Sequence, residues 1–251
     1  MKNIMLFALV VLLCSFTVDA KVKFGPIVTT EGVYKSFYEV QGDSYLIEGD
    51  ILVEPALEKD MKGTARRTGR WDKGIVPFVV DDSIPNPSRI ADAAAYLNAH
   101  TSIRLVARTN EASYVYFKNN GTAGCSSFVG RQGGKQIINV PDWCGSGSLV
   151  HEVLHALGFY HEQSRPDRHK SIKVKWSNIQ LSAWFNFFVA PFAKKYGEFD
   201  FNSIMLYPSY NGFAKDPNKP TMTKRDGSTF EGQRNGLSEG DFAALAQMYP
   251  N

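Results

Sequence analysis

The sequence predicts an α+β fold, in which several strands and two helices precede a long irregular region and a final helix. Apolar residues recur with helical spacing in 89–100 and in 237–249, and apolar helix formers surround His151 and His155. Segments with the character of strands are Trp71–Val80, Ile103–Ala107, Tyr114–Lys118 and Gln136–Val140. Beyond His169 the pattern becomes irregular, although the aromatic-rich stretch 176–188 has some helical character.

The composition is that of an ordinary globular protein and argues against several classes of partner. Hydrophobic residues make up 43% of the 251 positions and charged residues 21%, which is enough apolar material to bury a core. The net charge of +3 is too small to indicate a nucleic-acid partner or a membrane surface. No run of eighteen apolar residues occurs outside the N-terminus, so we expect no membrane span.

The first twenty residues have the pattern of a secretory signal. Lys2 supplies the positive start, Ile4–Phe16 the apolar run, and Val18–Ala20 the small residues of a cleavage site. The alternative, a buried N-terminal helix, is disfavoured because the run has no polar face. We therefore expect residues 1–20 to be a signal peptide and the protein to be secreted and extracellular.

The segment 21–67 differs from the rest of the chain, because it contains no cysteine, histidine or tryptophan. It ends in a basic stretch with Lys62, Arg66 and Arg67, which suits a cut by a trypsin-like protease. We interpret it as a pro-segment that is removed by proteolysis, leaving 68–251 as the main domain. A small N-terminal subdomain is the alternative.

Three of the five histidines fall within eleven positions, in the stretch HEVLHALGFYHEQSRPDR that covers 151–168. His151 and His155 are four residues apart, so on a helix they project from one face. Gly158 offers the backbone freedom that ends a helix, which allows His161 to turn back toward them. Three imidazoles with one open position are the arrangement of a catalytic zinc site.

Glu152 follows His151 directly and is poorly placed to be a further ligand on the same helix face. A carboxylate there is suited to take a proton from the attacking water and to return it to a leaving amine. The alternative is a helix that carries histidines on an apolar face by chance. The complete H-E-x-x-H-x-x-G-x-x-H spacing argues against that alternative.

Residues beyond the third histidine extend this motif further. Phe159, Glu162, Arg165, Asp167 and Arg168 complete the pattern H-E-x-x-H-x-x-G-F-x-H-E-x-x-R-x-D-R without a mismatch. In this the stretch resembles the astacins, a branch of the metzincin zinc endopeptidases.

The resemblance implies a role for several of these residues. His151, His155 and His161 are then the ligands of one zinc ion per chain, and Glu152 is the general base. Glu162 is similar to a family glutamate that meets the mature N-terminus through buried contacts after activation. Without the family context, an exposed glutamate beside arginines would be the simpler interpretation of Glu162.

The segment SIMLY at 203–207 resembles the methionine turn that metzincins place beneath the zinc histidines. Met205 is then the supporting methionine, a role that its flexible thioether suits. Tyr207 matches the family tyrosine that reaches zinc in the resting enzyme. In catalysis that tyrosine is expected to donate a hydrogen bond to the oxyanion.

The segment IEGDI at 47–51 resembles the F-x-G-D motif of astacin pro-segments, with Ile47 in place of phenylalanine. The resemblance implies that Asp50 is a zinc ligand in the zymogen only. A carboxylate at the position of the attacking water would hold the enzyme latent. Taken alone, Gly49-Asp50 is also an ordinary turn sequence.

Two cysteines, Cys125 and Cys144, remain once the signal is removed. In an exported protein such a pair is most simply interpreted as one disulfide, and the resemblance implies the same pairing. A second bridge that is usual in the family is missing. Ser102 stands at one of its positions, and the C-terminal MYPN lacks the other cysteine.

The pattern of the C-terminal segment 237–249 predicts an amphipathic helix, and we expect the minimal architecture without a further module. Ser238 is a candidate N-cap with Asp241 three residues on, as in a capping box. The expected buried stripe consists of Leu237, Phe242, Leu245 and Met248.

Together these features imply a two-lobed, metzincin-like catalytic domain. The upper lobe, from Trp71 to His161, is expected to hold a twisted mixed sheet and the zinc-binding helix, and the lower lobe to be largely irregular with a C-terminal helix. The expected protein is a secreted, monomeric zinc endopeptidase that cleaves extracellular proteins. It is made as a zymogen, inhibited by its own pro-segment, and requires an activating protease.

Two other classes stay open. A metzincin of another branch is disfavoured by Glu162 and by the set Arg165, Asp167 and Arg168. A binding protein that keeps zinc for structure is disfavoured by Glu152, since a structural site has no use for a proton acceptor there. Lys215 and Lys219 suggest a preference for acidic side chains after the scissile bond.

Overall fold

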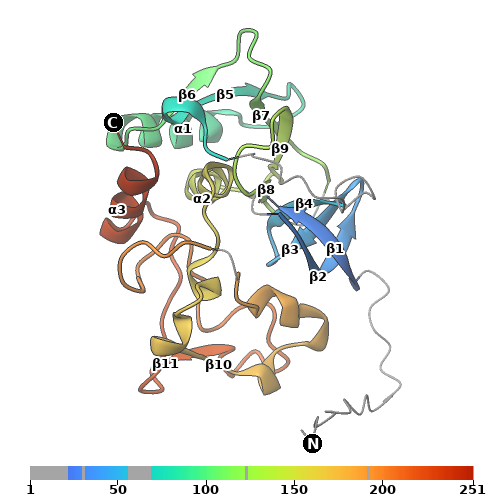
Figure 1. Cartoon of the computed structure of the whole chain (residues 1–251), viewed down its shortest axis with the longest axis vertical. Coiled ribbons are helices and arrows are strands. Elements are labelled where there is room, and N and C mark those ends of the chain that lie inside the picture. The colour runs from blue at the N-terminus through green and yellow to red at the C-terminus, as the bar shows by residue number, and fades with distance from the viewer. Residues whose placement is uncertain (1–21, 30–31, 56–68, 122–123, 191–192, 251) are drawn as a thin grey trace, which may run out of the picture.

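The computed structural model describes residues 22–29, 32–55, 69–121, 124–190 and 193–250 (Figure 1). The signal-like sequence at 1–20 and the basic stretch with Lys62, Arg66 and Arg67 lie outside the described residues. Within the part of the chain that the structure describes, no helix is long and apolar enough to cross a membrane.

The centre of the fold is a mixed sheet, as the sequence predicted. Its strands after residue 68 are β5 (Ile75–Val80), β6 (Arg104–Ala107), β7 (Tyr114–Lys118), β8 (Ser126–Phe128) and β9 (Lys135–Asn139). Strand β5 pairs in parallel with β6 and β7, β7 pairs in parallel with β9, and β8 pairs antiparallel with β9. Val140, expected in the last strand, lies just beyond β9, but its amide still donates a hydrogen bond to the Lys118 carbonyl of the neighbouring strand β7.

The segment before residue 68 continues this sheet. Strands β1 (Val22–Thr29), β2 (Gly32–Gln41), β3 (Ser44–Ile47) and β4 (Ile51–Pro55) form an antiparallel meander. Strand β4 then pairs in parallel with β8, so that Ile51 lies opposite Ser127 and Leu52 opposite Phe128. Among the described residues, the result is one sheet of nine strands in the order β1-β2-β3-β4-β8-β9-β7-β5-β6.

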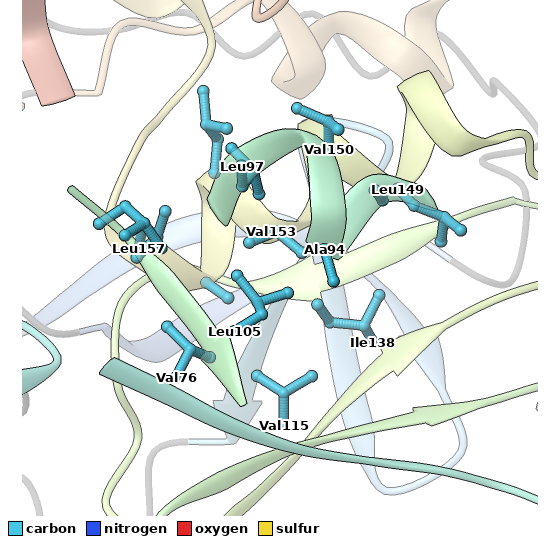
Figure 2. Close-up of a cluster of buried hydrophobic side chains, with 14 of the residues drawn as sticks. Val76, Ala94, Leu97, Leu105, Val115, Ile138, Leu149, Val150, Val153 and Leu157 are labelled. Carbon is cyan, nitrogen blue, oxygen red and sulfur yellow. The ribbon is translucent and has the colours of Figure 1, made fainter. Parts of the chain in front are cut away.

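Two helices pack together against the sheet and form the main core. They are α1 (Ser88–His100) and α2 (Ser146–Leu157). Figure 2 shows their apolar side chains, among them Leu97 of α1 and Val153 of α2, beside Val76, Val115 and Ile138 of the sheet. Burying this much branched aliphatic surface is the main stabilising term for the half of the protein that carries the motif helix.

The region below α2 in Figure 1 is mostly irregular, as expected. Its regular structure is a two-stranded sheet of β10 (Ile172–Val174) and β11 (Met222–Lys224). The aromatic-rich stretch forms two 3-10 segments, η4 (Trp176–Asn178) and η5 (Leu181–Phe187). A second apolar cluster fills this region, built largely from aromatic rings.

The last helix, α3 (Glu239–Met248), begins as the sequence predicted. The Ser238 hydroxyl accepts from the Asp241 amide, and the Asp241 carboxylate accepts from the Ser238 amide. Leu245 and Met248 are buried and join the main core, whereas Phe242 is half-buried.

One disulfide and one hydrogen bond connect parts of the chain that are distant in sequence. Cys125 and Cys144 form the expected disulfide. Where the second bridge was noted as missing, the Ser102 hydroxyl donates to the carbonyl of Tyr249 at 3.0 Å. The same two segments are therefore joined by a hydrogen bond.

Candidate metal centre

Helix α2 carries the first two histidines of the motif into the interior of the protein. His151 and His155 are 1% and 0% exposed. The helix ends at Gly158, whose φ of 113° lies in the left-handed region that favours glycine. The chain then reverses and brings His161, also buried, back to the first two. The turn that the sequence predicted from Gly158 is therefore present.

Each histidine is oriented by a hydrogen bond on the side away from the centre. The Nδ1 atoms lie 2.9 Å from the Ile204 carbonyl for His151, 2.8 Å from the Phe159 carbonyl for His155, and 2.9 Å from the Glu48 carboxylate for His161. When the rings are neutral and Nδ1 donates to these acceptors, the Nε2 atoms of all three rings are left as metal-binding atoms that face one another. This outer set of acceptors is the usual device that fixes the tautomer of metal-binding histidines.

Asp50 completes the group from the turn between β3 and β4. Its carboxylate oxygens lie 3.1 Å from His161 Nε2, 3.4 Å from His151 Nε2 and 3.6 Å from His155 Nε2. One ligand atom from each of the four residues lies within 4.8 Å of the others. The structure therefore brings Asp50, about a hundred residues away in sequence, onto the predicted histidine set.

The donor chemistry and the unsatisfied atoms fit a divalent metal at this point. Asp50 Oδ1 and His161 Nε2 are both buried and have no hydrogen-bond partner of acceptable geometry. Polar atoms buried in this way are costly unless something binds them. Three imidazole nitrogens and one carboxylate match the ligand types and the number that Zn²⁺ prefers.

Electrostatics act differently on the groups at the centre. Burial opposes the charged form of His161, but the Asp50 and Glu48 carboxylates outweigh it and raise the pKa of His161 to about 9, so this ring has to release a proton when it binds a metal. Burial lowers the pKa of His151 well below its usual range, which keeps the ring in the neutral form that binds metals. Burial opposes ionisation of Asp50, but the charge of His161 and hydrogen bonds from the three histidines outweigh it. The pKa of Asp50 therefore lies well below its usual range.

Glu152 lies on the same helix and is 2% exposed. Its Oε2 atom is buried without a hydrogen-bond partner. Burial, reinforced by the charge of Asp50, raises the pKa of Glu152 well above its usual range. A carboxyl group in this environment has a strong affinity for a proton, as a proton acceptor requires.

The segment with Met205 and Tyr207 passes next to the histidines. Asp241 fixes it by accepting from the Ser203 hydroxyl at 2.6 Å and from the Ile204 amide at 2.9 Å. Met205 is 1% exposed and its carbonyl accepts from the Glu162 amide. The Tyr207 ring lies 4.6 Å from the His161 ring, and its hydroxyl donates to the Glu48 carbonyl.

Glu162 points away from the metal centre. Its carboxylate accepts from the Asp200 amide at 2.8 Å and pairs with Arg165 at 3.2 Å. Burial raises the pKa of Glu162 to about 7. A cavity of about 260 Å³ lies beside it and is lined by residues that include Gly69 and Arg70. Glu162 is mostly buried, so the interpretation as an exposed glutamate is wrong.

Sequence patterns missed the residue that holds the third histidine. Glu48 is 5% exposed, and its carboxylate accepts from His161 Nδ1 and from the Ser164 hydroxyl at 2.8 Å. Its only sequence signal is a place two residues before Asp50. The histidines outside the motif, His100 and His169, are exposed and do not belong to the metal-binding group.

Comparisons with known proteins agree with this arrangement. The family model described as Astacin, a peptidase family, matches residues 63–250. Flavastacin of Elizabethkingia meningoseptica is 40% identical over 166 residues, which are 64% of this chain and 36% of flavastacin. Zinc metalloproteinase nas-14 of Caenorhabditis elegans is 36% identical over 244 residues, 84% of this chain and 48% of that protein. The chain thus spans less than half the length of these two relatives.

Among solved structures, the chain is similar to High choriolytic enzyme 1, a hatching enzyme zinc-protease from the medaka fish Oryzias latipes. The two share 30% sequence identity with a TM-score of 0.66, and the match covers 72% of this chain and 92% of that one.

Proposed function

The chain belongs to the astacin family of peptidases, and we propose that it is a secreted zinc-dependent endopeptidase made as a latent precursor. The observation that carries the proposal is that His151, His155, His161 and Asp50 converge next to Glu152, whose buried Oε2 atom has no hydrogen-bond partner. A structural zinc site would need the four ligands but not the buried glutamate.

Each group around the centre has a different role in the proposed peptide hydrolysis. When bound, zinc polarises the scissile carbonyl and lowers the pKa of water toward neutrality. Glu152 takes the proton from the attacking water and delivers it to the amide nitrogen that leaves. Tyr207 is held next to His161 by its own backbone, since its amide donates to Gln163 at 3.1 Å. Once its hydroxyl is free of Glu48, it can donate to the oxyanion.

In this proposal the precursor is latent because the pro-segment occupies both the ligand position of the attacking water and the strand edge that a substrate would use. Asp50 takes the ligand position from which water would react. Strand β4 pairs with β8, and the Ser127 amide donates to the Asp50 carbonyl at 2.9 Å. An extended substrate would need the same strand edge for its own backbone hydrogen bonds. The segment therefore competes with both the nucleophile and the substrate.

We further propose that cleavage within 62–67 removes the segment and creates a new N-terminus near Thr68. Gly69 and Arg70, the first described residues after that region, line the cavity beside Glu162. A free amino group there would give the buried Glu162 carboxylate a second charge partner beside Arg165. The signal-like sequence at 1–20 supports secretion, and the substrates would be extracellular proteins.

The test compares the full chain, processed by limited trypsin treatment, with its Glu152→Ala variant. Peptide hydrolysis and zinc content are measured on both, with His155→Ala as a metal-site variant and the exposed His169→Ala as its control. We expect Glu152→Ala to keep its zinc and to lose activity by about 100-fold or more, the usual contribution of general-base catalysis. His155→Ala should lose both, and His169→Ala neither.

Zinc bound equally by the parent and by Glu152→Ala, with no hydrolysis by either after confirmed processing, would overturn the catalytic proposal. It would favour a protein that binds zinc without using it for hydrolysis.

A further inference from the structure

Three aromatic rings form a platform on the irregular half of the protein, made of Trp176, Trp184 and Phe188. The rings of Trp176 and Trp184 lie 5.7 Å apart at 62°, and those of Trp176 and Phe188 lie 6.0 Å apart at 51°. The Trp184 indole donates to the Ile179 carbonyl at 3.1 Å, which locks that ring in place. Phe188 remains 38% exposed. The platform is thus a rigid apolar surface that is only partly covered.

The ring that contacts this platform, at Phe188, comes from the segment before residue 68 and is itself 41% exposed. Phe37 of β2 lies 6.2 Å from Phe188 in an edge-to-face arrangement. Phe37 is paired across the strands with Phe24, with ring centroids 4.8 Å apart. Side chains alternate along a strand, so the neighbouring Tyr38 points the other way and is buried in the segment's own core. Phe37 therefore lies outside that core, and its ring contacts are Phe24 within the segment and Phe188 of the platform.

The platform borders the apolar cluster that reaches the metal centre, because Trp176 and Trp184 pack against the cluster that contains Phe187 and Tyr207. Phe187, adjacent in sequence to Phe188, packs against Tyr207 at 6.3 Å and against Phe213 at 5.9 Å. Tyr207 in turn contacts His161. One extended segment of the precursor, from β2 through Asp50 to β4, thus touches the platform and the metal ligands together. Its removal uncovers both at the same time.

We propose that the platform is a substrate subsite, which takes an aromatic side chain from an extended stretch of the protein being cleaved. Phe37 occupies this subsite in the precursor. This inference rests on the proposed function and adds a specificity element to it. An aromatic side chain fits because edge-to-face and tilted ring pairs are favourable beyond their buried area, and because the partner rings are already fixed.

The first experiment measures docking of the segment itself. A synthetic peptide of residues 35–55 and its Phe37→Ala form are titrated against the processed Glu152→Ala chain, with tryptophan fluorescence as the readout. We expect Phe37→Ala to weaken binding about three- to tenfold, as for the loss of one aromatic pair. In a Phe188→Ala background the two peptides should bind equally, which completes a double-mutant cycle. The exposed Trp143→Ala should leave the difference intact.

The second experiment measures substrate preference with a random peptide library. The library is cleaved by the processed parent chain, and it is also selected for binding to the processed Glu152→Ala chain. Phe, Tyr and Trp should be enriched at one fixed distance from the scissile bond in the parent. The enrichment should disappear with Phe188→Ala and persist with Trp143→Ala.

The outcomes separate the subsite from the proposed function. Cleavage without aromatic enrichment, or enrichment that survives Phe188→Ala, overturns the subsite even if the peptide of residues 35–55 docks as expected. Binding selection that enriches aromatic residues through Phe188, in a chain that cleaves nothing, overturns the proposed function and leaves the subsite standing.

Discussion

Replacing Glu48 should loosen the metal from the precursor while leaving the processed enzyme unchanged. The Glu48 carboxylate is the acceptor for two buried donors, His161 Nδ1 at 2.9 Å and the Ser164 hydroxyl at 2.8 Å. In Glu48→Ala both donors are left without this partner. The side chain of Glu48 is 7% exposed, so water has little access to replace it.

The magnitude follows from the cost of an unsatisfied buried donor. One such group costs about 1–3 kcal/mol, and a tenfold change in an equilibrium corresponds to about 1.4 kcal/mol. Loss of an outer hydrogen bond to a metal-binding histidine typically weakens metal affinity by about 10- to 100-fold. We expect a zinc dissociation constant weaker by that factor for unprocessed Glu48→Ala, and a smaller change for Glu48→Gln, which keeps an uncharged acceptor.

The assay is competition between the unprocessed chain and a chromogenic chelator of known affinity. Asp43→Asn, in the exposed turn between β2 and β3, is the control for a lost acidic charge in the pro-segment. Processing supplies a second control, because parent and Glu48→Ala become the same chain once the segment is gone. A zinc affinity of unprocessed Glu48→Ala within twofold of the parent would refute the reasoning, as would a difference that persists after processing.

Two further changes probe the pro-segment turn and the last helix. Gly49 has a φ of 83°, and a Cβ there would lie 2.8 Å from the Tyr207 hydroxyl. Gly49→Ala should therefore displace the turn and raise hydrolysis by the unprocessed chain. Gly42→Ala, at a φ of 59° with open space around it, is the control and should leave hydrolysis unchanged. If the two variants are equally latent in a peptide assay, the close packing at Gly49 does not matter. Ser238→Ala removes the N-cap of α3 and should lower stability by about 1 kcal/mol, or about 2–4 °C in Tm by calorimetry. An unchanged Tm would mean that packing alone holds the helix.

The metal site was predictable because its geometry is local. A helix fixes the relation between His151 and His155, and Gly158 fixes the direction in which His161 returns. Likewise, the capping pattern at Ser238 predicted where α3 begins, because a cap involves only residues three apart. In each case the information lies within one or two turns of chain.

The course of the pro-segment was not predictable from local pattern. The pairing of Ile51 with Ser127 joins distant parts of the chain, and strands β4 and β8 are too short for their sequences to indicate which strand each one pairs with. The same holds for Glu48, whose role depends on where His161 and Ser164 come to lie. Ile47, which departs from the family pattern, is 3% exposed and packs in a cluster with Val129 and Tyr160. An aliphatic side chain fills this contact.

In the latent form that we propose, the turn at 48–50 makes three inhibitory contacts at once. Asp50 faces the Nε2 atoms of the histidines, the Glu48 carboxylate holds the Nδ1 of His161, and the Glu48 carbonyl accepts from the Tyr207 hydroxyl. The first contact uses the position of the nucleophile, and the third engages the hydroxyl that we assign to the oxyanion. Each contact alone is worth only a few kcal/mol in water. Because one short turn makes all three, the entropy of ordering it is lost once and the contacts reinforce one another. The same linkage means that displacing the segment releases the ligand position and Tyr207 together.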